Sequence, residues 1–117
     1  MREILFRGKD IISGRWTEGF LVGEQHIGNW VECDPIIPET VGQFTGLADK
    51  NGKKIFEGDI VKYGEHTMVV VWYDFLASFT LAFSVDGYYH ETMSKSDTYL
   101  EIIGNIHDNP ELLEATT

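Results

Sequence analysis

The stretch Ser78-Phe79-Thr80-Leu81-Ala82-Phe83-Ser84-Val85-Asp86-Gly87 decides the fold class of this chain. Large apolar residues alternate with small or polar ones through residues 78–85, which is the period of a β-strand with one buried face. Asp86-Gly87 is a strong signal for a two-residue hairpin turn, so residues 88–92 are expected to run back antiparallel to this strand.

The segments around this hairpin are also strand-like. Residues 67–73 are β-branched and aromatic with apolar character on both faces, which predicts an internal strand. A turn at 64–66 connects it to a strand at 59–63, and a last strand is predicted over 99–106, where Gly104 interrupts it. Nearer the N-terminus the predicted strands are 3–9, 15–22, 29–33 and 41–47, with connections at 10–14 and 23–28 and a loop bracketed by Pro35 and Pro38.

Helix is predicted only at the C-terminus, where Asn109 suits the N-cap, Pro110 the first helical position and Glu111 the first turn. The helix would have one or two turns. The sequence therefore predicts an all-β protein with a short C-terminal helical turn. We expect an N-terminal β-subdomain at 1–47 and a second unit at 48–117, which could together form one compact unit.

The charge is strongly acidic and unevenly placed. The 117 residues hold 19 acids and 9 bases, a net charge of −10, which opposes wrapping of a nucleic-acid backbone and binding to anionic membranes. Residues 1–62 hold 10 acids and 8 bases, whereas residues 63–117 hold 9 acids and one base, Lys95. An apolar content of 43% is too high for a disordered chain.

The sequence predicts no signal peptide and no membrane-spanning segment. Cys33 is the one cysteine, so no intrachain disulfide is expected. The first residues are charged from Arg2 onward, and the longest apolar run, 68–73, is far shorter than a membrane span. We expect a soluble cytoplasmic protein.

No arrangement typical of catalysis is found, so no enzymatic activity, cofactor or metal is predicted. The four histidines, His26, His66, His90 and His107, lack metal-ligand spacing, and Cys33 shows no nucleophile context. The carboxylates of Glu57, Asp59 and Asp74 are more simply explained by capping and turns than by convergence in an active site.

Several residues are predicted to shape the backbone. Gly46 lies in Thr45-Gly46-Leu47, which ends a strand, and Asn51-Gly52 would supply the positive-φ positions of a tight turn. Gly58 would turn the chain, and Asp59 would accept backbone N–H groups where the next strand begins. The predicted structural residues are Gly46, Asn51, Gly52, Gly58, Asp59, Gly104, Asn109 and Pro110.

Two charged surfaces leave alternatives open. Lys50, Lys53 and Lys54, with Lys62 nearby, could contact single-stranded nucleic acid beside aromatics such as Phe44 or Phe56, or could simply solubilise a turn. The acidic second half could imitate a phosphate backbone and inhibit a host DNA-binding protein, or could be a solvated face that prevents aggregation.

The aromatic residues are numerous for so small a core. Some of them are therefore expected at a subunit interface, to which the near-neutral first half would contribute more. The aromatics in question are Trp16, Phe20, Trp30, Trp72, Tyr73, Tyr88 and Tyr89.

Three segments, residues 1–9, 41–61 and 102–113, resemble in their order and spacing the YopX family of small bacteriophage and prophage proteins. The resemblance rests most on the central block around Thr45-Gly46-Leu47 and Glu57-Gly58-Asp59-Ile60-Val61. It implies a phage or prophage origin, an SH3-like barrel, here expected over about residues 55–106, and a homo-oligomer; it implies no biochemical activity. We therefore expect a self-associating protein-interaction module of a bacterial host cytoplasm, with a host or phage protein as a further partner.

Overall fold

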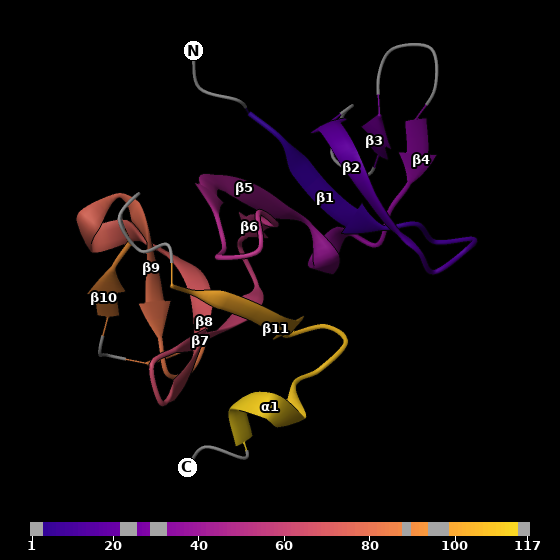
Figure 1. Cartoon of the computed structure of the whole chain (residues 1–117). Helices are drawn as coiled ribbons and strands as arrows, with labels where there is room; N and C mark the ends of the chain where they lie inside the picture. The colour runs from indigo at the N-terminus through magenta and orange to yellow at the C-terminus, as the bar shows by residue number, and fades with distance from the viewer. Residues whose placement is uncertain (1–3, 22–25, 29–32, 88–89, 94–98, 115–117) are drawn as a thin grey trace. The chain divides into compact units, whose positions relative to one another are not determined.

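A computed structural model describes residues 4–21, 26–28, 33–87, 90–93 and 99–114 of the chain. By their internal contacts the residues form two compact units, Met1–Gly46 and Leu47–Thr117. Each unit is described by itself below, with the elements labelled as in Figure 1.

The first unit is built from antiparallel strands. Its strands are β1 (Phe6–Lys9), β2 (Trp16–Leu21), β3 (His26–Gly28), β4 (Cys33–Pro35) and the first part of β5 (Gly42–Ala48), with the 3-10 turn η1 (Pro38–Thr40) before β5. They lie in the order β4-β3-β2-β1-β5. β5 ends in the second unit, where β6 (Lys54–Phe56) is its neighbour in the same sheet.

The core of the first unit is small and depends on glycine. Ile27 and Ile36 are fully buried. A Cβ added to Gly8 would lie 3.2 Å from Ile27 and 3.3 Å from Ile36, so the strand packs directly on both side chains. Thr40 is buried, and its hydroxyl accepts the Lys9 N–H and donates to the Ile37 carbonyl, at 2.9 and 2.6 Å. η1 is thereby fixed to β1.

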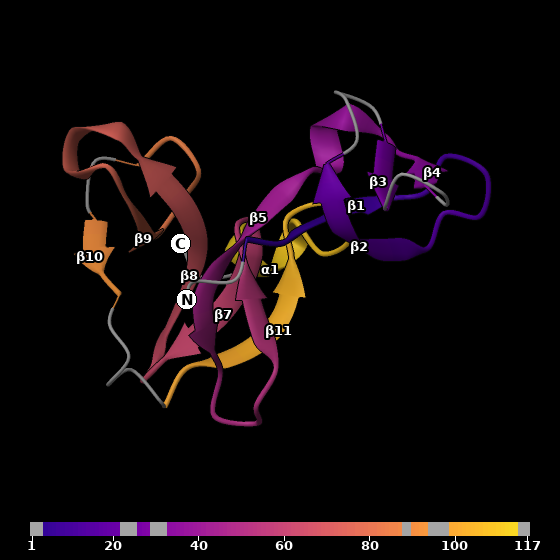
Figure 2. The same cartoon turned by 90° about the horizontal axis from the view of Figure 1, so that it is seen from above.

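The second unit is a meander with one added strand. Its further elements are β7 (Asp59–Tyr63), β8 (His66–Tyr73), the 3-10 turn η2 (Asp74–Leu76), β9 (Ser78–Ala82), β10 (His90–Thr92), β11 (Glu101–Asn105) and the short helix α1 (Glu111–Glu114). The five-stranded sheet has the order β10-β9-β8-β7-β11, and each neighbouring pair is antiparallel. Figure 2 shows β7 between β8 and β11.

The core of the second unit lies on both faces of β8. Val70 belongs to the larger cluster, with Ile55, Val61, Met68, Leu81 and Leu100. Val69 and Val71 point to the opposite face, where Ala82 joins them and Ile106 and Leu113 pack from the C-terminal segment. The prediction that residues 67–73 form an internal strand is confirmed by this burial on both faces.

Other predicted strands differ from the observed ones in where they begin and end. The alternation over 78–85 continues past the end of β9 at Ala82, and Phe83 and Val85 are exposed. His90 pairs with Ala82, so the connection is longer than the two-residue turn predicted at Asp86-Gly87, although the returning strand is antiparallel. The connection predicted at 23–28 contains β3, and most of the strand predicted at 29–33 lies outside the described residues.

The all-β prediction is confirmed, because the two sheets are antiparallel and the described residues hold one short α-helix. β10 and β11 are the two edges of the five-stranded sheet, so the pairings described do not close it into a barrel. In the described part of the chain, no helix is long and apolar enough to cross a membrane.

Candidate functional site

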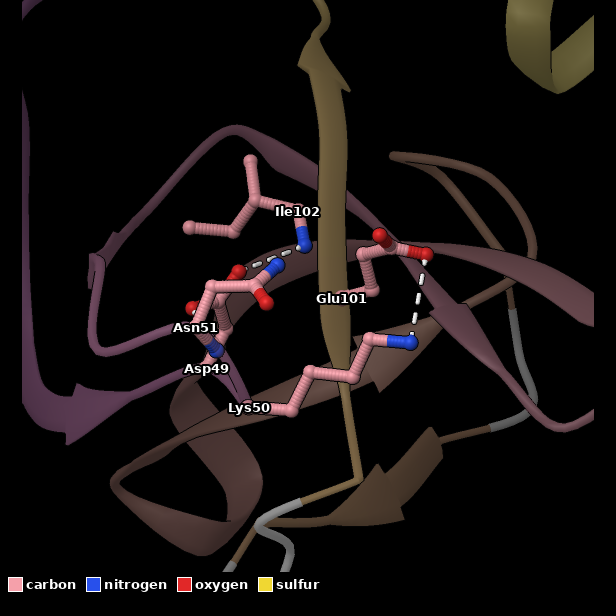
Figure 3. A network of polar contacts seen from close by, with 5 residues as sticks. All are labelled: Asp49, Lys50, Asn51, Glu101 and Ile102. Carbon is pink, nitrogen blue, oxygen red and sulfur yellow. Dashed lines mark hydrogen bonds and ion pairs between the residues drawn. The ribbon is translucent and has the colours of Figure 1, made fainter.

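The turn between β5 and β6 carries Lys50 and Lys53, two of the four predicted lysines, and is organised by Asp49. One carboxylate oxygen of Asp49 accepts the N–H groups of Asn51 and Lys53, at 2.8 and 2.9 Å. The other accepts the N–H of Ile102 in β11, at 3.1 Å (Figure 3). The Lys50 N–H donates to the Leu100 carbonyl at 2.8 Å. The turn is therefore hydrogen-bonded to the backbone at the start of β11, through Leu100 and Ile102.

The electrostatics of Asp49 follow from this arrangement. The side chain is 5% exposed, and this burial raises its pKa. The N–H groups of Ile102, Lys53 and Asn51 and the charge of Lys53 outweigh burial and hold the pKa below its ordinary value of 3.8. Asp49 is therefore an ionised structural carboxylate at neutral pH.

The predicted lysine loop is exposed but lies beside an acid. Lys50 Nζ lies 3.6 Å from a carboxylate oxygen of Glu101, as Figure 3 shows, and Lys62 is the cross-strand partner of Glu101. Lys53 and Lys54 are exposed on the same turn and the start of β6. Glu101 thus stands between Lys50 and Lys62 and lowers the positive potential that a phosphate backbone would meet.

The second group of predicted structural residues surrounds the start of β7. Gly58 has a φ of +93°, its N–H donates to the Val70 carbonyl and its carbonyl accepts the Ile106 N–H. Asp59 is buried, and its carboxylate accepts the N–H of Phe56 at 2.8 Å. The turn thereby ties β6 to β7 and to the residues after β11.

The C-terminal residues fold back on β11. The Asn105 side chain accepts the N–H groups of His107 and Asp108, both at 3.0 Å. The Asn109 side chain accepts the Asn105 N–H at 3.3 Å, and Pro110 precedes α1. A Cβ on Gly104 would lie 2.6 Å from the Asn109 side-chain oxygen, so glycine allows this close approach.

Some site predictions were wrong. Gly52 has a φ of +81°, and Gly46 has +89°, but among the described non-glycine residues only Ala77 has a positive φ, so Asn51 does not. Phe56 is buried, with 3% of its surface exposed, and cannot stack on a nucleic acid base. Phe44 is half-buried in the first unit.

Sequence reasoning singled out only part of the aromatic tip, which we define as Trp72, Tyr73, Asp74, Phe75 and Leu76. Trp72 and Tyr73 were named among the expected interface aromatics, whereas Phe75 and Leu76 were not. Phe75 is 84% exposed, and Trp72 and Leu76 are each 46% exposed. Phe75 and Leu76 are adjacent apolar residues between the predicted strands 67–73 and 78–85. Two large apolar residues in such a connection, where polar residues are usual, are the signal that could have indicated exposed apolar side chains here.

Three carboxylates at these sites hold the local backbone or a neighbouring side chain in place. Asp49 and Asp59 bind backbone N–H groups, and Asp74 accepts the Trp72 indole N–H at 2.7 Å. Within the described ranges no group of three His, Cys, Asp or Glu residues is placed to hold a metal ion.

Comparisons with known proteins agree with the fold. The family model described as "YopX protein" matches residues 7–114. The crystal structure of protein EF1440 from Enterococcus faecalis is similar, with 26% sequence identity and a TM-score of 0.56 over 97% of this chain and 99% of that one. A search of curated proteins found no match.

Proposed function

Because the chain belongs to the YopX family, we propose, for its role, that it is a self-associating protein-interaction module that acts in a bacterial cytoplasm. The observation that carries this proposal is a set of large apolar side chains exposed on the first unit. They are Ile4, Ile11, Ile12, Phe20 and Leu21. Where exposed apolar side chains gather into a contiguous patch, they mark a surface that binds other proteins.

The most exposed of these side chains stand on an ordered turn. Ile12 is 85% exposed and Ile11 is 57% exposed, between β1 and β2. The Asp10 carboxylate accepts the N–H groups of Ile12 and Ser13, at 2.7 and 3.0 Å, and the Asp10 carbonyl accepts the Gly14 N–H. A turn that is already ordered loses little conformational entropy when it binds.

The charge distribution favours the first unit as the contact between copies. The first unit, residues 1–46, holds 7 acids and 4 bases, a net charge of −3, whereas residues 47–117 hold 12 acids and 5 bases, a net charge of −7. Two copies that meet through the less acidic unit avoid part of their mutual repulsion.

We propose the SH3-like barrel as the fold of the second unit. The strand order β11-β7-β8-β9-β10 supports it, because four consecutive strands form a meander and the last strand returns beside the first. This is the strand order of SH3-like barrels. Such small barrels serve widely as binding modules, but the fold alone does not assign a function.

Contact with nucleic acid is the second candidate, because Lys50, Lys53, Lys54 and Lys62 are all exposed. Glu101 beside Lys50 and Lys62 opposes it. A gel shift at low salt with single-stranded and duplex DNA tests this candidate. Loss of a shift in a Lys53→Ala/Lys54→Ala variant would support it, and the absence of any shift would reject it.

Light scattering after size exclusion tests self-association. A mass that is a multiple of 13.3 kDa is expected for the wild type, and a shift toward 13.3 kDa for Ile12→Ser/Phe20→Ser. Phe75→Ser is the matched control, since Phe75 at 84% is as exposed as Ile12 at 85% but belongs to the second unit. A monomeric wild type would reject the proposal.

A further inference from the structure

We propose that the aromatic tip of the second unit is a docking site for a different protein, one that offers an apolar pocket bordered by lysine or arginine side chains. The tip comprises Trp72 to Leu76 at the connection of β8 and β9, the coil to the left of β9 in Figure 1. This inference goes beyond self-association, because it assigns a separate surface of the chain to a separate partner.

The exposure of the tip is the first step of the argument. Phe75 leaves 84% of its surface in water and Leu76 leaves 46%. Burying side chains of this size in a partner removes apolar surface from water, which favours association. Aromatic anchors of this kind contribute a large share of the binding energy in protein interfaces.

The tip is also held in one conformation. The Trp72 indole donates to Asp74, and its ring packs edge-on against Phe79 at a centroid distance of 5.1 Å. η2 ends at Leu76 and is followed by Ala77, whose φ of +48° is unusual for a residue other than glycine. The fold maintains this conformation with the Ala77 N–H donating to the Asp74 carbonyl at 3.1 Å.

A stacked pair supports the tip from β10. The Tyr73 and His90 rings are parallel to within 7°, with centroids 3.8 Å apart. The ring centroids of Tyr73 and Phe75 lie 6.0 Å apart. His90 is held at both ring nitrogens, by the Thr80 hydroxyl at 2.8 Å and the Gly87 carbonyl at 3.0 Å. The residues that pack beside Phe75 are therefore held in place by His90, which reduces the conformational entropy lost on binding.

The charge around the tip indicates which kind of partner binds it. Asp74 lies within the tip and is exposed, and residues 63–117 carry nine acids against one base. A second copy that docked through the same surface would bring Asp74 against Asp74 in an acidic field. A pocket bordered by lysine or arginine would instead meet opposite charge, which adds specificity and speeds association.

Selection from a random peptide library displayed on phage tests the proposal with the full chain as bait. Enriched peptides are expected to combine apolar residues with net positive charge. An enriched peptide should bind Phe75→Ser at least about tenfold more weakly than wild type by titration calorimetry. It should bind Ile12→Ser/Phe20→Ser, which alters the proposed self-association surface, with unchanged affinity.

The outcomes separate the two proposals. Enriched peptides that are neutral or acidic, or that bind Phe75→Ser as tightly as wild type, would overturn the docking site. So would a fall in the mass of the wild-type oligomer on Phe75→Ser, because the tip would then be a contact between copies. A monomeric wild type that still binds basic peptides through Phe75 would reject self-association and leave the docking site supported.

Discussion

The carboxylate of Asp49 accepts the backbone N–H of Ile102, 53 residues further along the chain, at 3.1 Å. The same carboxylate closes its own turn through Asn51 and Lys53. One buried acid therefore shapes the turn before β6 and also satisfies a backbone donor on the edge of β11. An edge that is covered in this way is less open to pairing with another chain.

Removal of the Asp49 carboxylate should destabilise the second unit. Asp49→Ala leaves the N–H groups of Asn51, Lys53 and Ile102 without this acceptor, at a cost of about 2 to 4 kcal/mol in the free energy of unfolding. Urea unfolding measures the loss. Lys50→Ala is the control, because its ion pair with Glu101 is solvent-exposed and is worth about 0.5 kcal/mol or less. Equal losses in the two variants would contradict the assigned role of Asp49.

The lowered pKa of Asp49 predicts an acid-sensitive contribution to stability. Because its pKa in the folded state lies below the ordinary 3.8, the unfolded chain binds the proton more readily. The stabilisation is thus fully present above the unfolded pKa and is lost as the pH falls through the lower, folded pKa. Asp49→Asn should show a shallower decline in the free energy of unfolding below about pH 4.

Urea titrations at a series of acidic pH values measure this slope. Lys53→Met gives a graded comparison, because it removes the smallest of the effects that lower the pKa and keeps the three backbone donors. Its slope should stay close to that of the wild type. An Asp49→Asn protein with the full wild-type slope would show that other acids govern the acid sensitivity.

Local patterns predicted which segments are strands better than where they end. The valines of 69–71 indicate a strand buried on both faces because the pattern itself records two apolar faces. Phe83 and Val85 continue the alternation of β9, yet they are 43% and 51% exposed. β9 stops pairing at Ala82, opposite Val69, although β8 continues to His66. A period of two cannot report where the pairing with a neighbouring strand stops.

At the candidate sites too, the local features could be predicted from the sequence and the long-range contacts could not. Gly58 and Asp59 were predicted as a turn with a capping acid, because both roles act within a few residues. The role of Asp49 toward Ile102 could not be predicted, because it depends on which distant strand edge lies beside the turn. The lysines of that turn were found, but Glu101, which lies beside Lys50, was not.

The close approach of Gly104 and Asn109 predicts a coupled pair of substitutions. Gly104→Ala would place its Cβ 2.6 Å from the Asn109 side-chain oxygen, so the side chain must shift and lose its bond to the Asn105 N–H. We expect a loss of about 1 to 3 kcal/mol. In an Asn109→Ala background the same change should cost less, and a double-mutant cycle by urea unfolding measures the coupling. Additive losses would contradict the steric explanation.

Gly52 offers the opposite case, in which backbone conformation alone sets the cost. Its φ is +81°, and an added Cβ would meet nothing within 4 Å. Gly52→Ala should therefore cost about 1 to 2 kcal/mol, the penalty of a left-handed conformation. Gly52→Asn should cost less, because asparagine adopts this region more readily, and Gly52→Val should cost more. Thermal unfolding of the three variants gives the order. If alanine and asparagine cost nothing, the turn does not require a positive φ at this position, whereas a loss for Gly104→Ala would still be expected from its contact with Asn109.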